Sequence, residues 1–327
     1  MSHHPIRTVI GAAVITAALL VSTGCSSRNA AVSTAAATSG GGYPVTVASC
    51  GVDYTYDRAP QRVLLGAPGV VDTLDALGVG DRAIGYALAD LDHGEQAAHP
   101  QLTENTTDWT PGKEYLAGAA PDLLIANDEQ QFSGDGAAGL DDLRSLGSGL
   151  YVLGDYCVDS TATPSVDAVY DDIDALGAIF DVPQRAKTLN DQLRARVATA
   201  AALHGGDQQL TAASVTIVDG TVYALTGAGY QAVLDALDLS NVFSGAGANF
   251  TQISREDVIT ADPDIIFVTY AGDGQEAAAV ASAKTMFAGS AAVDDGRVFG
   301  QDENAFQAGG VRIIGVVEQA AKDAFSG

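Results

Sequence analysis

Short apolar runs of strand length alternate with amphipathic stretches over most of this chain. The strand-like runs lie at residues 45–47, 52–56, 62–65, 83–86, 123–126, 150–153, 214–218, 222–225, 265–269 and 297–299. Between them, apolar residues at helical spacing predict helices over 70–77, 140–146, 231–237 and 311–324. Strands that alternate with helices form mainly parallel sheets with helices on both faces. The pattern therefore predicts an α/β fold.

The alternation stops in the middle of the chain. Apolar residues recur at helical spacing from Ser165 to Phe180, and a second stripe begins after Pro183 and runs to His204. At ~1.5 Å per residue, the second helix would be roughly 33 Å long, enough to pass from one α/β lobe to another. One stiff helix between two lobes predicts a rigid connector, and hence a small closure of the lobes when a ligand binds.

Two parts of the sequence repeat one pattern in the same order. Residues 113–125 and 255–267 both begin with a basic residue and a glutamate, and both end in Pro-Asp and an apolar run. Upstream, residues 74–79 (LDALGV) are echoed by residues 234–239 (LDALDL). The repeat predicts two lobes of similar build, and a cleft between such lobes commonly holds a ligand. The predicted boundaries are 43–163 for the N-terminal α/β lobe, 164–206 for the helical connector and 207–327 for the C-terminal α/β lobe.

The first 42 residues have the composition of an export signal and a tether. Arg7 gives a positive start, residues 9–21 are apolar but too short to span a bilayer comfortably, and small residues lead to Cys25. This order is typical of a lipoprotein, with a signal peptide over 1–24 and a lipid on Cys25. Residues 25–42 would then form a flexible tether. The alternative is an ordinary secretory signal.

Two further cysteines, Cys50 and Cys157, remain after Cys25 is assigned to lipid. In an exported protein they most simply form one disulfide. Such a bond would close a loop around the first lobe, which adds on the order of 4–5 kcal/mol in the chain-entropy model. A metal site on the two cysteines is the alternative, but no histidine lies near either of them in the sequence.

The charge of the chain narrows the classes of partner. A net charge of −25 with only 16 Lys and Arg leaves no basic face for nucleic acid, and anionic ligands would be repelled overall. Residues 134–139 satisfy G-x-G-x-x-G. In a dinucleotide-binding site these glycines directly follow a strand, whereas here several polar residues separate them from the preceding predicted strand. No other catalytic motif stands out, so we expect neither an enzyme nor a cofactor. An exported acidic α/β enzyme and an adhesive or signalling lipoprotein are the alternatives.

Taken in order, the lipoprotein start, residues 74–82, the two Glu…Pro-Asp segments and the long helix resemble the substrate-binding proteins of ABC importers. The group that carries iron–siderophores, haem and vitamin B12 is the most similar, and the resemblance covers about residues 43–325. It implies a lipid-anchored protein on the extracytoplasmic face of the cell membrane, with a ligand cleft between its lobes. It also implies that Glu114 and Glu256 dock onto arginines of a permease, where charge-assisted contacts are strong and directional. Alternatively, both are first-turn acids of short helices, favoured there by the helix dipole.

A ligand of such a fold contacts the loops that follow the carboxyl ends of the strands. These loops carry aromatic and amide side chains, which suit a large ligand of mixed polarity. The candidate ligand-binding residues are Tyr86, Trp109, Asn127, Gln130, Phe132, Tyr223, Thr226, Tyr230, Tyr270, Gln301 and Asn304. Tyr86 and Tyr270 could equally plug the ends of their strands.

The residue types in these loops also restrict the ligand. A bare metal ion needs several converging histidines and carboxylates, and the cluster of Asp90, Asp92, His93, Glu95 and His99 fits a solvated acidic loop better. A ferric catecholate is strongly anionic and would need several arginines in the cleft, whereas the arginines here fall mostly in the leader, the connector and the ends of elements. We therefore expect a monomer that binds a ferric siderophore of the hydroxamate type or a similar large chelate, with haem or cobalamin as alternatives.

Overall fold

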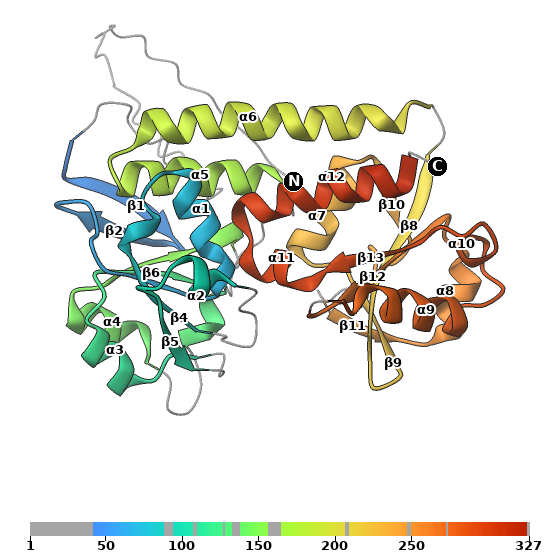
Figure 1. Ribbon diagram of the computed structural model, residues 1–327, viewed down its shortest axis with the longest axis horizontal. Coiled ribbons are helices and arrows are strands. Elements are labelled where there is room, and N and C mark those ends of the chain that lie inside the picture. The colour runs from blue at the N-terminus through green and yellow to red at the C-terminus, as the bar shows by residue number, and fades with distance from the viewer. Residues whose placement is uncertain are drawn as a thin grey trace, which may run out of the picture. The chain divides into compact units, whose positions relative to one another are not determined.

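The structure is a computed structural model (Figure 1). It describes residues 42–87, 94–106, 110–126, 128–132, 138–155, 165–206, 209–246, 250–272 and 274–325. These residues belong to one unit, Ala35–Gly327. They form a five-stranded sheet, a six-stranded sheet and a two-stranded hairpin, with helices around them, which confirms the predicted α/β class. No helix in the described ranges is both long and apolar enough to cross a lipid bilayer.

The first sheet is entirely parallel, in the strand order β5-β4-β3-β6-β7. Its strands are β3 (Val63–Leu65), β4 (Ala83–Ala87), β5 (Thr103–Thr106), β6 (Leu123–Ala126) and β7 (Gly149–Val152). The helices of this part are η1 (Pro68–Val70), α1 (Val71–Ala76), η2 (Gly80–Arg82), α2 (Glu95–Ala98), α3 (Lys113–Ala119), η4 (Glu129–Phe132), α4 (Leu140–Leu146) and η5 (Leu153–Asp155). Every residue of β3 and β6 is buried, as expected for central strands covered on both faces. The predicted hairpin at the start is β1 (Val45–Ser49) with β2 (Val52–Tyr56).

The second sheet is mixed, in the order β11-β9-β8-β12-β13, with β10 pairing with the amino half of β8. Its strands are β8 (Leu210–Val218), β9 (Thr221–Leu225), β10 (Leu239–Asn241), β11 (Phe250–Ile253), β12 (Ile265–Tyr270) and β13 (Val298–Asp302). Its helices are α7 (Ala228–Ala236), α8 (Arg255–Ala261), α9 (Glu276–Met286), α10 (Ala291–Asp294), α11 (Glu303–Ala308) and α12 (Gly310–Phe325). The strands β9 and β11 are antiparallel, so the second lobe departs from the all-parallel order of the first.

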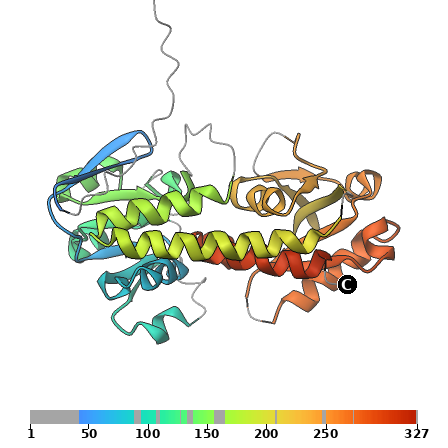
Figure 2. The same ribbon diagram turned by 90° about the horizontal axis from the view of Figure 1, so that it is seen from above.

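The helical segment between the sheets is as predicted. It consists of α5 (Asp167–Ile179), α6 (Pro183–Ala201) and η6 (Ala202–His204). Pro183 opens α6, where its fixed φ suits the first turn and its missing N–H is not needed. The helix α6 packs against α5 and against α12 (Figures 1 and 2). Arg196 on α6 donates two hydrogen bonds of 2.7 Å to the Glu318 carboxylate of α12. The helix therefore contacts elements on both sides of the connection.

The largest hydrophobic core is not confined to one sheet. It includes Leu65 and Ile125 of the first sheet, Ile173 of α5, Phe267 of the second sheet and Ile314 of α12. Two smaller cores lie under the outer helices of each sheet, one around Leu124 and Leu143, the other around Val268 and Phe287. Apolar packing thus runs continuously from one sheet to the other through the connector helices.

The repeated Pro-Asp motif proves to be a strand clamp. Asp122, just before β6, accepts hydrogen bonds at 2.9 Å from the backbone N–H of Gln61 and of Arg62, which lead into β3. Asp264, just before β12, accepts from the backbone N–H of Thr211 at 2.7 Å and from its hydroxyl at 2.8 Å. In both lobes the aspartate fixes the neighbouring central strand at its start, which explains why the motif occurs twice.

Removing one clamp should lower the stability of the fold. We expect Asp264→Ala to reduce the free energy of unfolding by about 2–3 kcal/mol, because it removes charge-assisted bonds and leaves the Thr211 N–H without its acceptor. Urea unfolding followed by circular dichroism measures this. Asp191→Ala on exposed α6 is the control, with an expected change within about 0.5 kcal/mol. Equal urea midpoints for the two variants would show that the Asp264 clamp does not stabilise the fold.

The second repeated segment is a core signature. Leu74 and Leu77, at the end of α1, and their counterparts Leu234 and Leu237, at the end of α7, are all buried in the largest core. Each helix is followed by a residue with positive φ, Gly78 at 72° and Asp238 at 54°. Glycine and aspartate adopt this left-handed conformation more readily than most residues. The echo therefore marks equivalent helix ends.

Candidate functional site

One face of the second sheet becomes polar toward the carboxyl ends of its strands. Side chains alternate along a strand, so Ala213 and Val215 of β8 point into the outer core while Ser214 and Thr216 point to the opposite face. The same inner face includes Phe267 of β12, and two residues further Thr269, which pairs in register with Gln301 of β13. Buried polar side chains on adjacent strands thus share one face.

Helices α7, α11 and α12 cover this inner face, and two of them reach the first lobe. The apolar side chains of these helices belong to the largest core, together with Phe267. The helix α11 contacts η1, and α12 contacts α1, both of the first lobe. The polar residues therefore lie on the same face of the second sheet as the two helices that contact the first lobe.

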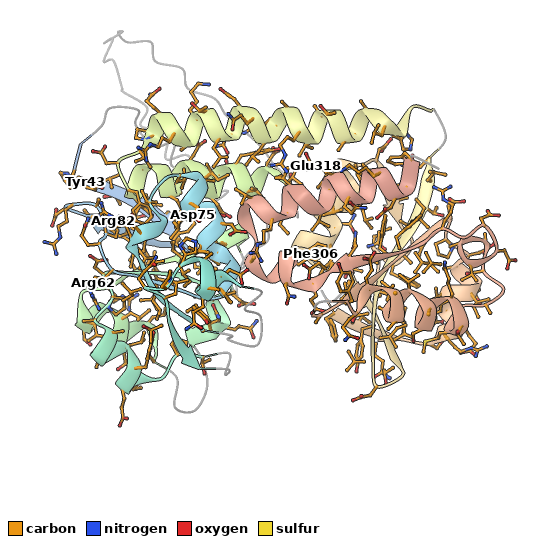
Figure 3. All side chains as sticks on the ribbon, viewed as in Figure 1. Tyr43, Arg62, Asp75, Arg82, Phe306 and Glu318 are labelled. Carbon is orange, nitrogen blue, oxygen red and sulfur yellow. The ribbon has the colours of Figure 1, made fainter. Side chains whose placement is uncertain are left out.

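Two aromatic pairs lie at this part of the second lobe. Tyr223 of β9 stacks on Phe250 of β11, with ring centroids 4.4 Å apart and 22° between planes, and Phe250 is 52% exposed. Tyr230 of α7 stacks on Phe306 of α11 at 4.1 Å and 29° (Figure 3 labels Phe306). An exposed stacked pair and a half-buried one offer flat surfaces for a ligand with rings or long apolar arms.

Glu303 is the titratable group of this region with the clearest perturbation. It opens α11 directly after β13, is half-buried, and its Oε2 accepts a hydrogen bond of 3.3 Å from the Thr269 hydroxyl. Burial raises the pKa of the Glu303 carboxyl, and the charge of Asp302 raises it further, against the opposing effect of the Thr269 bond. Asp302 itself caps α11 by accepting from the Asn304 N–H at 3.0 Å.

The predicted ligand residues of the second lobe divide by burial. Gln301 and Asn304 are buried, at 5% and 3% exposure, and Gln301 accepts a long 3.5 Å bond from the Ser214 hydroxyl. Thr226, at the end of β9, and Tyr270, at the end of β12, are half-buried. Tyr270 pairs with Asp302 across β12 and β13, so it lies one residue from Glu303.

The predicted ligand residues of the first lobe are less fully placed. Tyr86 is 1% exposed and belongs to the main core, so in this structure it fills the end of β4. Gln130 lies on η4 and is exposed. Phe132 closes η4, and Trp109 and Asn127 lie outside the described residues, as does Cys157. The contribution of this lobe to a ligand site therefore stays a prediction.

Sequence reasoning missed Glu303, Thr269 and Phe250. Glu303 stands between two predicted ligand residues, Gln301 and Asn304, and that position was the available signal. Nothing in an Asp- and Glu-rich sequence distinguishes a half-buried carboxylate from a solvated one. Phe250 follows a glycine-rich stretch, and its stacking on Tyr223, which lies diagonally across the β9–β11 pair, becomes evident only from the structure.

The described members of the acidic cluster around His99 pair with side chains of other helices. His99 pairs with Asp75 of α1 at 3.0 Å, and the carboxylate of Glu95 pairs instead with Arg312 of α12. Asp90, Asp92 and His93 lie outside the described residues. Within the described ranges, no group of three or more His, Cys, Asp or Glu side chains could hold a metal ion.

Glu114 and Glu256 occupy equivalent positions, at the second residue of α3 and of α8. Both are exposed, in the first turn of a short helix, where a negative charge is stabilised by the helix dipole. Glu256 pairs with its neighbour Arg255 at 3.0 Å, an exposed pair that leaves the carboxylate open to other partners. Their exposure on both lobes is compatible with docking as well as with capping.

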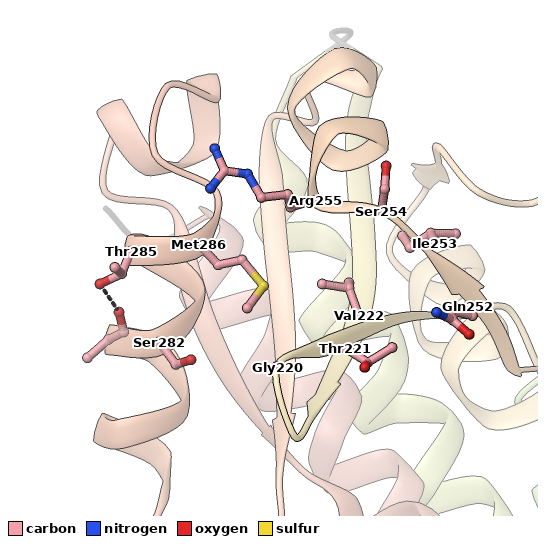
Figure 4. A pocket seen from close by; sticks show the side chains of 11 residues that line it. Gly220, Thr221, Val222, Gln252, Ile253, Ser254, Arg255, Ser282, Thr285 and Met286 are labelled. Carbon is pink, nitrogen blue, oxygen red and sulfur yellow. Dashed lines mark hydrogen bonds between the residues drawn. The ribbon is translucent and has the colours of Figure 1, made fainter.

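A cavity of about 690 Å³ lies beside α8, on the outer side of the second lobe. Figure 4 shows it between the β8–β9 turn, the start of α8 and α9, with Met286 and Val222 among its lining side chains. Its lining residues are Gly220, Thr221, Val222, Gln252, Ile253, Ser254, Arg255, Ala281, Ser282, Thr285 and Met286. It contains no predicted ligand residue, and it adjoins Glu256 through Arg255.

Known proteins share this sequence pattern and this fold. The vitamin B12-binding protein of Yersinia pestis (strain Pestoides F) is 25% identical over 216 residues, which cover 65% of this chain and 70% of that protein. The crystal structure of an ABC-type Fe3+-hydroxamate transport system from Saccharomonospora viridis DSM 43017 superposes with a TM-score of 0.70 at 24% identity, covering 86% of this chain and 99% of that one. A periplasmic heme-binding protein of Vibrio cholerae has a TM-score of 0.64 at 18% identity, covering 80% and 98%.

The family model for the periplasmic binding proteins matches residues 63–305. This stretch runs from β3 to α11, and so includes both sheets and the connector. Its members are solute-binding proteins and not enzymes. The chain therefore belongs to the periplasmic binding protein family, as a substrate-binding protein of the ABC-importer type.

Proposed function

We propose that this protein is an extracytoplasmic lipoprotein that captures a ferric siderophore of the hydroxamate type and delivers it to an ABC permease. The observation that carries the proposal is the inner face of the second sheet. There, buried Gln301 of β13 leads into α11, which carries half-buried Glu303, buried Asn304 and the Phe306 ring that stacks on Tyr230. Such a surface suits a large ligand of mixed polarity with many hydrogen-bonding groups.

The placement of basic residues favours a hydroxamate over an anionic catecholate. The basic residues of the second lobe are Arg255, Lys284, Arg297, Arg312 and Lys322. Arg255 and Arg312 form ion pairs, and Arg297 donates to the Ala324 carbonyl at 2.9 Å. Lys284 and Lys322 are exposed on α9 and on the last turn of α12. A strongly anionic chelate would meet little compensating charge on this lobe.

The proposal includes the localisation of the protein and the arrangement of its parts. Cys25 would carry the lipid after removal of residues 1–24, and residues 25–42 would tether two lobes, 43–163 and 207–327, joined by the connector 164–206. Cys50 and Cys157 would form one disulfide. The mature protein would act as a monomer and dock onto permease arginines through Glu114 and Glu256.

Binding of a panel of ligands tests the function. The unlipidated chain 26–327 is titrated by calorimetry with ferrichrome, ferrioxamine B, a ferric catecholate, haem and cobalamin. We expect saturable binding of a ferric hydroxamate at micromolar concentration or below. Tight binding of haem or cobalamin alone would replace the siderophore assignment. Failure of all five to bind, or turnover of a bound compound, would contradict a role in uptake of this class of ligand.

A further inference from the structure

Glu303 is the first residue of α11, a helix through which the second lobe contacts the first. Its helix α11 contacts η1 of the first lobe, and its side chain accepts from Thr269 at the carboxyl end of β12. The carboxyl ends of strands are where open α/β sheets bind ligands. The residue is half-buried, so part of it remains accessible.

Among the described residues, no cation forms an ion pair with the Glu303 carboxylate. The neighbouring groups that affect its pKa are the Thr269 hydroxyl, which lowers it, and the acidic Asp302, which raises it. A partly desolvated carboxylate with one neutral hydrogen bond is an unfavourable group to retain in a fold. Asp302 and Glu303 are adjacent, so two negative charges lie together at the start of α11 in a protein that is already acidic.

A second polar atom nearby has no partner. Gln301 is 5% exposed, and its Nε2 forms no hydrogen bond in the structure. Gln301 pairs in register with Thr269, the residue that donates to Glu303. The end of the inner face therefore includes the half-buried Glu303 acceptor and, next to Thr269 in the sheet, a buried amide donor that lacks an acceptor. A buried polar group that is left unsatisfied in a native fold is uncommon and calls for an explanation, and contact with a bound group is one.

We propose that Glu303 selects the ligand, by accepting hydrogen bonds from an ammonium or other cationic donor of the bound chelate. This inference rests on the proposed function, and it narrows the substrate class to ferric hydroxamates that carry a positive pendant group. A charge-assisted bond in a partly desolvated site is stronger than its neutral counterpart, so the positive group discriminates between otherwise equal chelates. Glu303 thus acts as a specificity residue.

A matched pair of ligands isolates the charge. Ferrioxamine B carries a pendant ammonium, and its N-acetylated derivative presents the same iron chelate without the charge. We expect the wild-type chain to bind ferrioxamine B about tenfold or more tightly than the acetylated form. In Glu303→Gln the preference should fall to near onefold, mainly through weaker binding of ferrioxamine B. Glu276→Gln, which removes an exposed carboxylate from α9, should keep the wild-type preference.

Each outcome separates the inference from the proposed function. Binding of both ligands with equal affinity by the wild-type chain would overturn the role of Glu303 without any variant. The role of Glu303 would also be overturned if Glu303→Gln kept the preference for ferrioxamine B over its acetylated form, provided that a thermal melt shows the variant to be folded. In both cases uptake of a ferric hydroxamate would stand. If the wild-type chain binds no hydroxamate at all, the proposed function fails and the inference fails with it.

Discussion

Replacing Arg312 with methionine is expected to lower the free energy of unfolding by about 3–5 kcal/mol, the range for breaking a buried ion pair from one side. The guanidinium, on α12, bonds Asp72 of α1 at 2.6 Å and also bonds Glu95 of α2. Its side chain is 22% exposed, and that of Glu95 only 5%. Burial opposes the charge of Arg312, but the bonds to both carboxylates outweigh it and raise the pKa of Arg312. Without arginine, the charge of Glu95 would stay buried without its cation.

Denaturant unfolding of matched variants measures this effect. Arg196→Met removes the guanidinium that α6 offers to Glu318, a more exposed pair, and should cost about 1 kcal/mol or less. The double variant Arg312→Met with Glu95→Gln should recover part of the loss, because the buried charge goes with its partner. If Arg312→Met unfolded at the same denaturant concentration as Arg196→Met, the Arg312 cluster would contribute no more to stability than the exposed Arg196–Glu318 pair.

The Arg312 cluster also bears on how the lobes are joined. Val311, next to Arg312, donates its N–H to the Thr73 hydroxyl of α1 at 3.2 Å. Gly69 of η1 lies so close that a Cβ there would fall 2.5 Å from the guanidinium. The two sheets thus share a polar contact and a continuous apolar core in addition to the connector helix. A wide opening of the lobes would have to break these contacts, and the small closure on ligand binding stays a prediction.

The sequence pattern predicted the strands and helices that have strong periodicity. The strand 123–126 and the helix 140–146 have the predicted bounds, and the helix predicted from Pro183 continues to His204. The pattern placed the start of β8 at Ser214, four residues late. The strand begins at Leu210 because residues 210–212 pair with β10, and Asp264, far along the chain, accepts a hydrogen bond from Thr211. Such a tertiary contact leaves no periodic signal in the strand itself.

The candidate site was harder to predict than the fold. Loops after strands are readily located, but whether a side chain faces a ligand depends on its burial. Tyr86 and Tyr270 look alike in sequence, yet Tyr86 is enclosed in the core and Tyr270 is half-buried. The repeated motifs were likewise ambiguous, because the glutamate of each is exposed while the aspartate eight residues later is a structural clamp.

Removing both Glu114 and Glu256 is expected to abolish uptake without weakening the binding of ligand. Both carboxylates are exposed, at the second residue of α3 and of α8, and neither lies on the inner face of the second sheet. If each pairs with a permease arginine, loss of both should reduce uptake of radioiron-loaded chelate by cells at least tenfold, since truncating one partner of a docked charge pair costs about 2–5 kcal/mol. The dissociation constant of the purified double variant for the same chelate should equal that of the wild type.

The matched control removes two carboxylates from elsewhere. Asp167→Ala with Asp191→Ala takes the same charge from α5 and α6, where both residues form only exposed ion pairs. That variant should support wild-type uptake. Because Glu114 and Glu256 also stabilise the first turns of their helices, a loss of about 0.3–1 kcal/mol for each is expected and does not by itself reduce uptake. Normal uptake by a Glu114→Ala/Glu256→Ala variant would reduce these residues to helix-capping acids, and the docking surface would have to be sought elsewhere on the lobes.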